Sequence, residues 1–164
     1  MADGGASTFI LLITALLVSG SVSAVLINQW GDMTNALEEN RKGKEADSKT
    51  SVAFAGDAME VDYDDSVSPN VMTFYLQNTG QYVLDEDTLV IMVDGVSVTS
   101  NITATILPSG ADWTDDRLLE VEVFSNSWAY QNDDSVSISA VVSSEITSGY
   151  RGTDTMNIEV RLDV

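Results

Sequence analysis

An uncharged apolar run near the start of the sequence limits what this chain can fold into. Between Ala6 and Ile27 there is no Asp, Glu, Lys or Arg. At about 1.5 Å per residue, a helix over this run matches a hydrocarbon core of about 30 Å. Secretory signals normally have a positive start and a shorter apolar core, whereas Asp3 is the only charge ahead of this run. We therefore expect a retained membrane-length helix; cleavage after Ala24 is the alternative.

Small residues recur within the run at a spacing that lets helices pack closely. Ala15, Ser19 and Ser23 stand at every fourth position. Gly20 and Ala24 repeat the same interval. Small residues four apart allow two helix backbones to approach each other in lipid. The pattern predicts packing between helices, and a plain single-span anchor is the alternative.

The apolar pattern continues beyond the membrane-length run as an amphipathic helix. Bulky apolar residues follow at intervals of four, three and four, and Trp30 stands where an aromatic anchor at the membrane edge is expected. One helix from about Gly5 to about Lys49 would be about 65 Å long, which is more than an anchor needs and suits a bundle of packed subunits. The predicted packing surface consists of Ala15, Ser19, Gly20, Ser23, Ala24, Leu26, Trp30, Met33 and Leu37.

The charge balance limits the partners of the chain. There are 26 acidic and 7 basic residues, which give a net charge of −19. Nucleic acid is a poor partner for such a chain, because phosphate binding needs Lys and Arg to release counterions, and we expect none. Anionic lipid surfaces are disfavoured by the same charge. Such acidity is typical of a protein surface that stays hydrated in a salt-loving organism, so we expect a halophilic source.

The sequence shows no catalytic constellation of residues. The sequence has no Cys and no His, which excludes zinc sites and His-based acid–base chemistry. It has no phosphate-binding glycine loop, no general base to activate a Ser hydroxyl, and no Lys in an apolar strand where its pKa would fall. We expect no enzyme activity, no catalytic residues, no metal site and no cofactor.

From residue 51 onward, apolar residues recur at every second position of the sequence. Apolar and polar side chains alternate in residues 118–124, 136–142 and 156–164, as is typical of half-buried antiparallel strands. Asp94 and Gly95, between two further apolar segments, predict a two-residue hairpin turn. Seven or eight short strands over about 110 residues predict an immunoglobulin-like antiparallel β-sandwich.

The predicted fold class is therefore α+β, with two segments. Residues 1–50 are expected to form a hydrophobic and amphipathic helix that spans the membrane and assembles. Residues 51–164 are expected to form an extracellular β-sandwich domain.

Two features of the predicted loops suggest ligands or modification. Acidic clusters at residues 62–65, 85–87 and 115–116 offer oxygens of the kind that bind Ca²⁺ or Mg²⁺, but none has the EF-hand spacing, so solvated turns are the expectation. Asn101 and Thr103 form an Asn-Ile-Thr acceptor sequence for N-glycosylation, which is meaningful if the β domain is extracellular.

Several stretches resemble a known family. The run FILLITALLVSGSVSAVLINQW, followed by ALEENRKGKEADS and a β domain, resembles the archaellin superfamily, whose members have a type IV pilin-like N-terminal helix. FYLQNTGQYVL, TLVIMVDG and DWTDDRLLEVEV resemble strand and turn blocks of its FlaG-type accessory proteins, which belong to the archaellum stator. Archaellins carry a basic leader clipped just before the apolar run, and none precedes Ala6. The sequence thus resembles an unprocessed FlaG-type protein or a mature chain numbered from its first residue.

The resemblance implies a structural, non-enzymatic subunit of an archaeal surface motility machine. FlaG-type proteins help to tether the rotary archaellum motor to the cell envelope. The implied partners are copies of the chain or related archaellum subunits, a surface-layer protein and the membrane. The implied location is the membrane, with the β domain outside the cell, or an extracellular filament. The alternatives are a filament-forming archaellin or adhesion pilin and, from another class, a single-span membrane-anchored binding domain.

Overall fold

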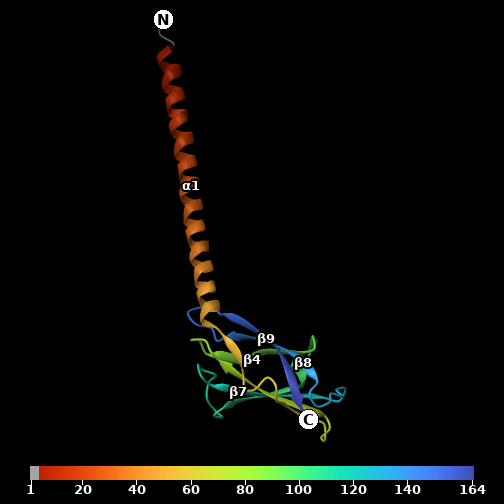
Figure 1. Ribbon diagram of the computed structural model, residues 1–164. Coiled ribbons are helices and arrows are strands. Elements are labelled where there is room, and N and C mark those ends of the chain that lie inside the picture. Colours follow the sequence, from red (N-terminus) through yellow and green to blue (C-terminus); the bar gives the residue numbers. More distant parts are fainter. Residues whose placement is uncertain (1–3) are drawn as a thin grey trace. The chain divides into compact units, whose positions relative to one another are not determined.

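The computed structural model describes residues 4–164 (Figure 1). The chain forms two compact units, Met1–Arg41 and Lys42–Val164, which are described separately. Helix α1 (Gly4–Lys49) runs through the first unit and ends in the second, and the strands all follow it. The predicted α+β class, a long apolar N-terminal helix followed by a mainly antiparallel β domain, is confirmed.

Helix α1 is 46 residues long. It contains no proline, the residue that most strongly interrupts a helix, and Gly20, Gly31 and Gly43 lie within it without breaking it. Residues 5–41 are all exposed in the single chain. The helix as a whole is not amphipathic, because its first half is apolar on every side.

The second unit contains nine strands and one short 3₁₀ helix within the described residues. They are β1 (Val52–Ala55), β2 (Val61–Asp64), β3 (Asn70–Asn78), β4 (Leu84–Val93), β5 (Val96–Ser97), η1 (Thr99–Asn101), β6 (Ile102–Leu107), β7 (Leu118–Ser125), β8 (Ser135–Ser144) and β9 (Thr153–Asp163). The count exceeds the predicted seven or eight, and it includes the two-residue strand β5.

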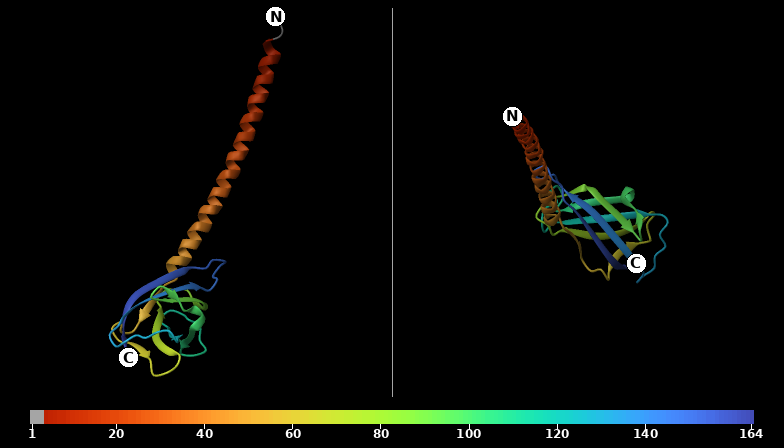
Figure 2. Two further views of the ribbon diagram at one scale, coloured as in Figure 1. Left: turned by 90° about the vertical axis from the view of Figure 1, so that its right-hand side faces the viewer. Right: turned by 90° about the horizontal axis from the view of Figure 1, so that it is seen from above.

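The strands form one curled sheet, which the two views of Figure 2 show from the side and from above. Its order is β5-β4-β8-β9-β2-β3-β7-β6, and β1 also pairs with β3. Every pairing is antiparallel except β2 with β9, where Val61 lies opposite Leu162 in a parallel arrangement. Among the described residues, strand β6 pairs with β7 alone and forms one edge of the sheet.

The core follows the predicted alternation of side chains. Leu119, Val121 and Val123 of β7 are fully buried. The buried apolar residues of the two halves of the sheet form a single cluster, which includes the large side chains of Trp113 and Phe74. The hairpin at Asp94 and Gly95 is also confirmed, since both residues have positive φ angles, 50° and 75°, as this two-residue turn requires.

Candidate assembly surface and the base of the helix

The predicted packing surface lies entirely within α1. Since successive helical residues turn by about 100°, seven of the nine residues fall within an arc of about 80°. These seven, called the packing stripe below, are Ala15, Ser19, Ser23, Leu26, Trp30, Met33 and Leu37. Gly20 and Ala24 lie outside this arc, about 60° and about 100° beyond one of its edges. The side chains of the stripe are open to a partner: Trp30 is 66% exposed and Leu37 is 61% exposed.

Hydroxyl groups in the apolar half of α1 bond to the helix itself. Thr14 donates to the carbonyl of Ile10 at 2.8 Å, and Ser23 donates to the carbonyl of Ser19 at 2.8 Å. Such bonds satisfy a hydroxyl without a partner from outside the helix. The polar residues therefore do not prevent this segment from entering lipid or a dry helix bundle. By length and composition, α1 includes one segment able to cross a membrane.

The last two turns of α1, residues 42–49, belong to the second unit and pack into a socket. The socket consists of the β3–β4 loop, residues 79–83, and the β8–β9 loop, residues 145–152. Ala46 faces it and is 2% exposed. Two glycines permit the close approach: a Cβ on Gly80 would stand 2.5 Å from the carbonyl oxygen of Lys49, and one on Gly152 would overlap the carbonyl of Ala46.

Hydrogen bonds fix the helix end in the socket. The carbonyl oxygen of Lys49 accepts the backbone N–H groups of Gln81 at 2.7 Å and Tyr82 at 3.1 Å. The Asp47 carboxylate accepts the N–H of Thr153 at 3.1 Å. A helix C-terminus leaves carbonyls without partners inside the helix, and here a neighbouring loop supplies two donors to the last one. The end of α1 is thus held by the β3–β4 loop and by the first residue of β9.

The β3–β4 loop is itself held by a buried amide. Asn78 is fully buried. Its Nδ2 donates to the carbonyls of Tyr82 and Trp113, both at 2.8 Å, and its Oδ1 accepts the N–H of Gly80 at 2.9 Å. Every polar atom of this side chain has a partner, as burial of an amide requires.

Two lysines of the helix base lie over aromatic rings. Lys49 Nζ is 5.6 Å from the centre of the Tyr82 ring and 2.7 Å from the Glu45 carboxylate. The hydrogen bond with Glu45, reinforced by its charge, raises the pKa of Lys49 above its ordinary value. Lys42 Nζ lies 6.0 Å from the centre of the Tyr150 ring. The socket was not predicted from the sequence, in which Gly80 and Gly152 indicate turns but not what packs against them.

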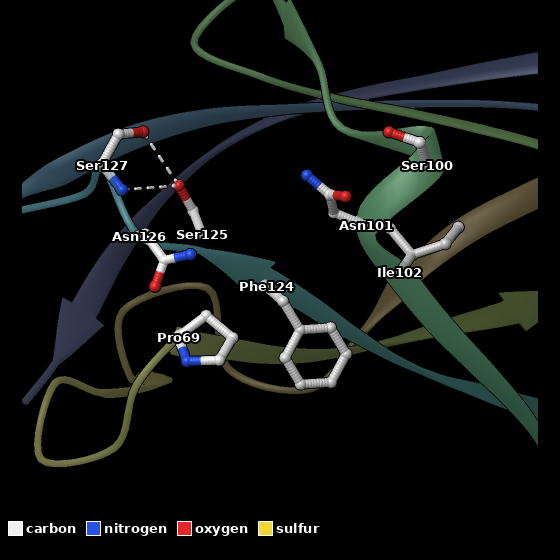
Figure 3. Close-up of a pocket in the computed structure, with 8 residues that line it drawn as sticks. All are labelled: Pro69, Ser100, Asn101, Ile102, Phe124, Ser125, Asn126 and Ser127. Carbon is white, nitrogen blue, oxygen red and sulfur yellow. Dashed lines mark hydrogen bonds between the residues drawn. The ribbon is translucent and has the colours of Figure 1, made fainter.

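Asn101, the predicted glycosylation acceptor, lies at the end of η1 and directly before β6. Its side chain is exposed and makes no hydrogen bond with the described residues. Figure 3 shows it pointing into a surface depression. The residues that line this depression are Pro69, Ser100, Asn101, Ile102, Phe124, Ser125, Asn126 and Ser127.

The acidic clusters organise turns. Asp64 Oδ1 accepts the N–H and the hydroxyl of Ser66 at 2.9 and 2.6 Å, and these bonds lower the pKa of Asp64. Asp85 pairs with Arg151 at 2.8 Å. Within residues 4–164, no three Asp or Glu side chains are grouped in a way that could hold a metal ion.

A long apolar helix with an exposed packing stripe, followed in the chain by a β domain, is typical of a structural subunit. The sequence matches the family model for archaeal-type flagellin over residues 2–163, and the chain belongs to that family. The predicted membership of the archaellin superfamily is confirmed, and this is a family of structural, non-enzymatic subunits.

No curated protein matches the chain. Among solved structures, the chain is similar to AggA, the major subunit of aggregative adherence fimbriae type I from Escherichia coli, at 12% sequence identity and a TM-score of 0.30. The match covers 69% of this chain and 92% of AggA.

Proposed function

We propose that this protein is an envelope subunit that assembles through the packing stripe of α1, with its β domain outside the cell. The observation that supports assembly most directly is the exposure of residues 5–41 in the single chain. Burial of apolar surface stabilises an assembly by about 25 cal/mol per Å² removed from water. The stripe also extends past the membrane-length run to Leu37, where a solitary anchor would gain nothing from further apolar residues.

Within the family, we propose the FlaG-type role. The chain would help to tether the archaellum motor to the envelope, and a surface-layer protein would bind its β domain. The resemblance of the strand and turn blocks to FlaG-type proteins supports this role. A filament-forming archaellin or adhesion pilin is the second candidate, and the family match over residues 2–163 favours it.

The two roles differ in where the protein is found. Filaments sheared from native cells, and the membranes left behind, would be compared by electron microscopy and peptide mass spectrometry. We expect the chain to remain with the membranes and the motor base. If it forms the major repeating component of the sheared filament, it is an archaellin or pilin and the tethering role is wrong. If it stays in the membrane as a monomer, a membrane-anchored binding domain is the better description.

We also propose that Asn101 carries an N-linked glycan. Its exposure, its lack of a hydrogen-bond partner among the described residues and its place in an Asn-Ile-Thr sequence support this. Peptide mass spectrometry of the native protein tests the proposal. An unmodified peptide containing Asn101 would show that it is wrong.

A further inference from the structure

We infer that the depression beside Asn101 is a seat for the first sugars of a glycan attached to that residue. The inference rests on the proposed extracellular position of the β domain and on Asn101 as acceptor. The depression has a volume of about 500 Å³.

The sheet places an aromatic ring next to the acceptor. Strands β6 and β7 pair so that Ile102 lies opposite Val123. Asn101 and Phe124 are therefore the next neighbours across the two strands. Since Val123 faces the core, Phe124 lies on the outer face of the sheet, where its ring is half-buried. Figure 3 shows the ring along one side of the depression, with Pro69 beside it.

The depression is also lined by polar groups. In Figure 3 the Asn126 amide nitrogen points into the space that the Asn101 side chain also enters. Asn126 Oδ1 accepts a long hydrogen bond from Ser68 at 3.4 Å, while Nδ2 has no partner among the described residues. The hydroxyls of Ser125 and Ser127 lie 3.0 Å apart beside it.

This combination fits a saccharide better than the other ligand classes. A sugar ring has an apolar C–H face, which packs on an aromatic ring, and hydroxyl edges, which need donors and acceptors. The lining residues are all uncharged, although the chain has a net charge of −19. A cation would need carboxylates in the lining, and an anion would need Lys, Arg or a helix N-terminus of some length. The lining therefore suits a neutral, partly apolar ligand.

The test is a double-mutant cycle on the full chain, produced in a glycosylating archaeal host and solubilised in detergent. Thr103→Val removes the glycan while keeping Asn101, and Phe124→Ala removes the ring. We expect loss of the glycan to lower Tm by about 2–5 °C when Phe124 is present and by less than about 1 °C in the Phe124→Ala background. Thr105→Val, outside the acceptor sequence on the same strand, is the matched control and should leave Tm nearly unchanged.

Two results would overturn the inference. One is an equal effect of the glycan on Tm with and without Phe124. The other is an unmodified Asn101, seen by mass spectrometry of the purified chain. If Phe124→Ala fails to fold, Asn126→Ala replaces it in the cycle with the same expectation. An unmodified Asn101 overturns the glycosylation proposal together with this inference, whereas an equal effect of the glycan with and without Phe124 overturns this inference alone. Neither result depends on whether the chain forms filaments or stays with the motor base.

Discussion

At the scale of single residues, Gly152 should be the most sensitive glycine at the helix base. Its Cβ would overlap Ala46 and Thr50, so we expect Gly152→Ala to lower the free energy of unfolding of the second unit by about 1–3 kcal/mol. Gly43 lies in the helix with open space around it, and Gly43→Ala should instead stabilise by about 0.5–1 kcal/mol. Thermal unfolding followed by circular dichroism measures both. Stabilisation by both substitutions would mean that the socket is not tightly packed.

Stability should depend on pH through the side chain of Tyr130. The Tyr130 hydroxyl donates to Asp94 at 2.9 Å. Burial, and then this hydrogen bond, raise the pKa of Tyr130 well above its ordinary value of 10. The raised pKa means that Tyr130 contributes its full stabilisation of the fold below pH 10, the pKa it has in the unfolded chain. This contribution is lost as the pH rises from there through the higher pKa that Tyr130 has in the folded protein.

Tyr130→Phe isolates this contribution. At pH 8 the variant should be less stable than the natural protein by about 1 kcal/mol, because the hydrogen bond to Asp94 is missing. The difference in Tm between the two proteins should shrink between pH 9 and pH 11, since the phenylalanine cannot ionise. A difference that stays constant over this range would contradict the assignment.

At the scale of the helix, the packing stripe predicts that one face of α1 matters for assembly. Ser19→Glu places a carboxylate within the stripe, where helix contact would leave it without water, at a cost of about 2.5–3.5 kcal/mol in lipid. We expect the variant to reach the membrane but to lose oligomers, as measured by membrane fractionation and cross-linking. Ser21→Glu makes the same change about 200° around the helix and should retain them. Equal loss in both variants would show that the stripe is not the contact face.

The elements differ in how far the sequence predicts them. The alternation of side chains in β7, β8 and β9 follows directly from burial of one face, so these strands and the helix were predictable from local pattern. The socket was not, because Gly80, Gly152 and Asn78 take their roles from loops that approach the helix base only in the folded domain. The same holds for Phe124: its place beside Asn101 depends on the register between β6 and β7, which no local pattern sets.

At the scale of the whole molecule, the net charge of −19 should make stability depend on salt. Carboxylates that repel one another across the surface destabilise the compact state. Their interaction range falls from about 10 Å at 0.1 M salt to about 3 Å at 1 M. We therefore expect Tm to rise with NaCl, most steeply between 0.1 and 1 M, and assembled species to dissociate at low salt.

The control for the salt effect is a neutral solute. Sucrose strengthens burial by exclusion from the protein surface and does not screen charge. If screening is the cause, NaCl should raise Tm well beyond sucrose at equal osmolality, and the gain should level off once neighbouring carboxylates are screened. A Tm that is independent of NaCl, or that sucrose raises equally, would show that the surface charge does not limit stability, and the expectation of a halophilic source would lose its physical basis.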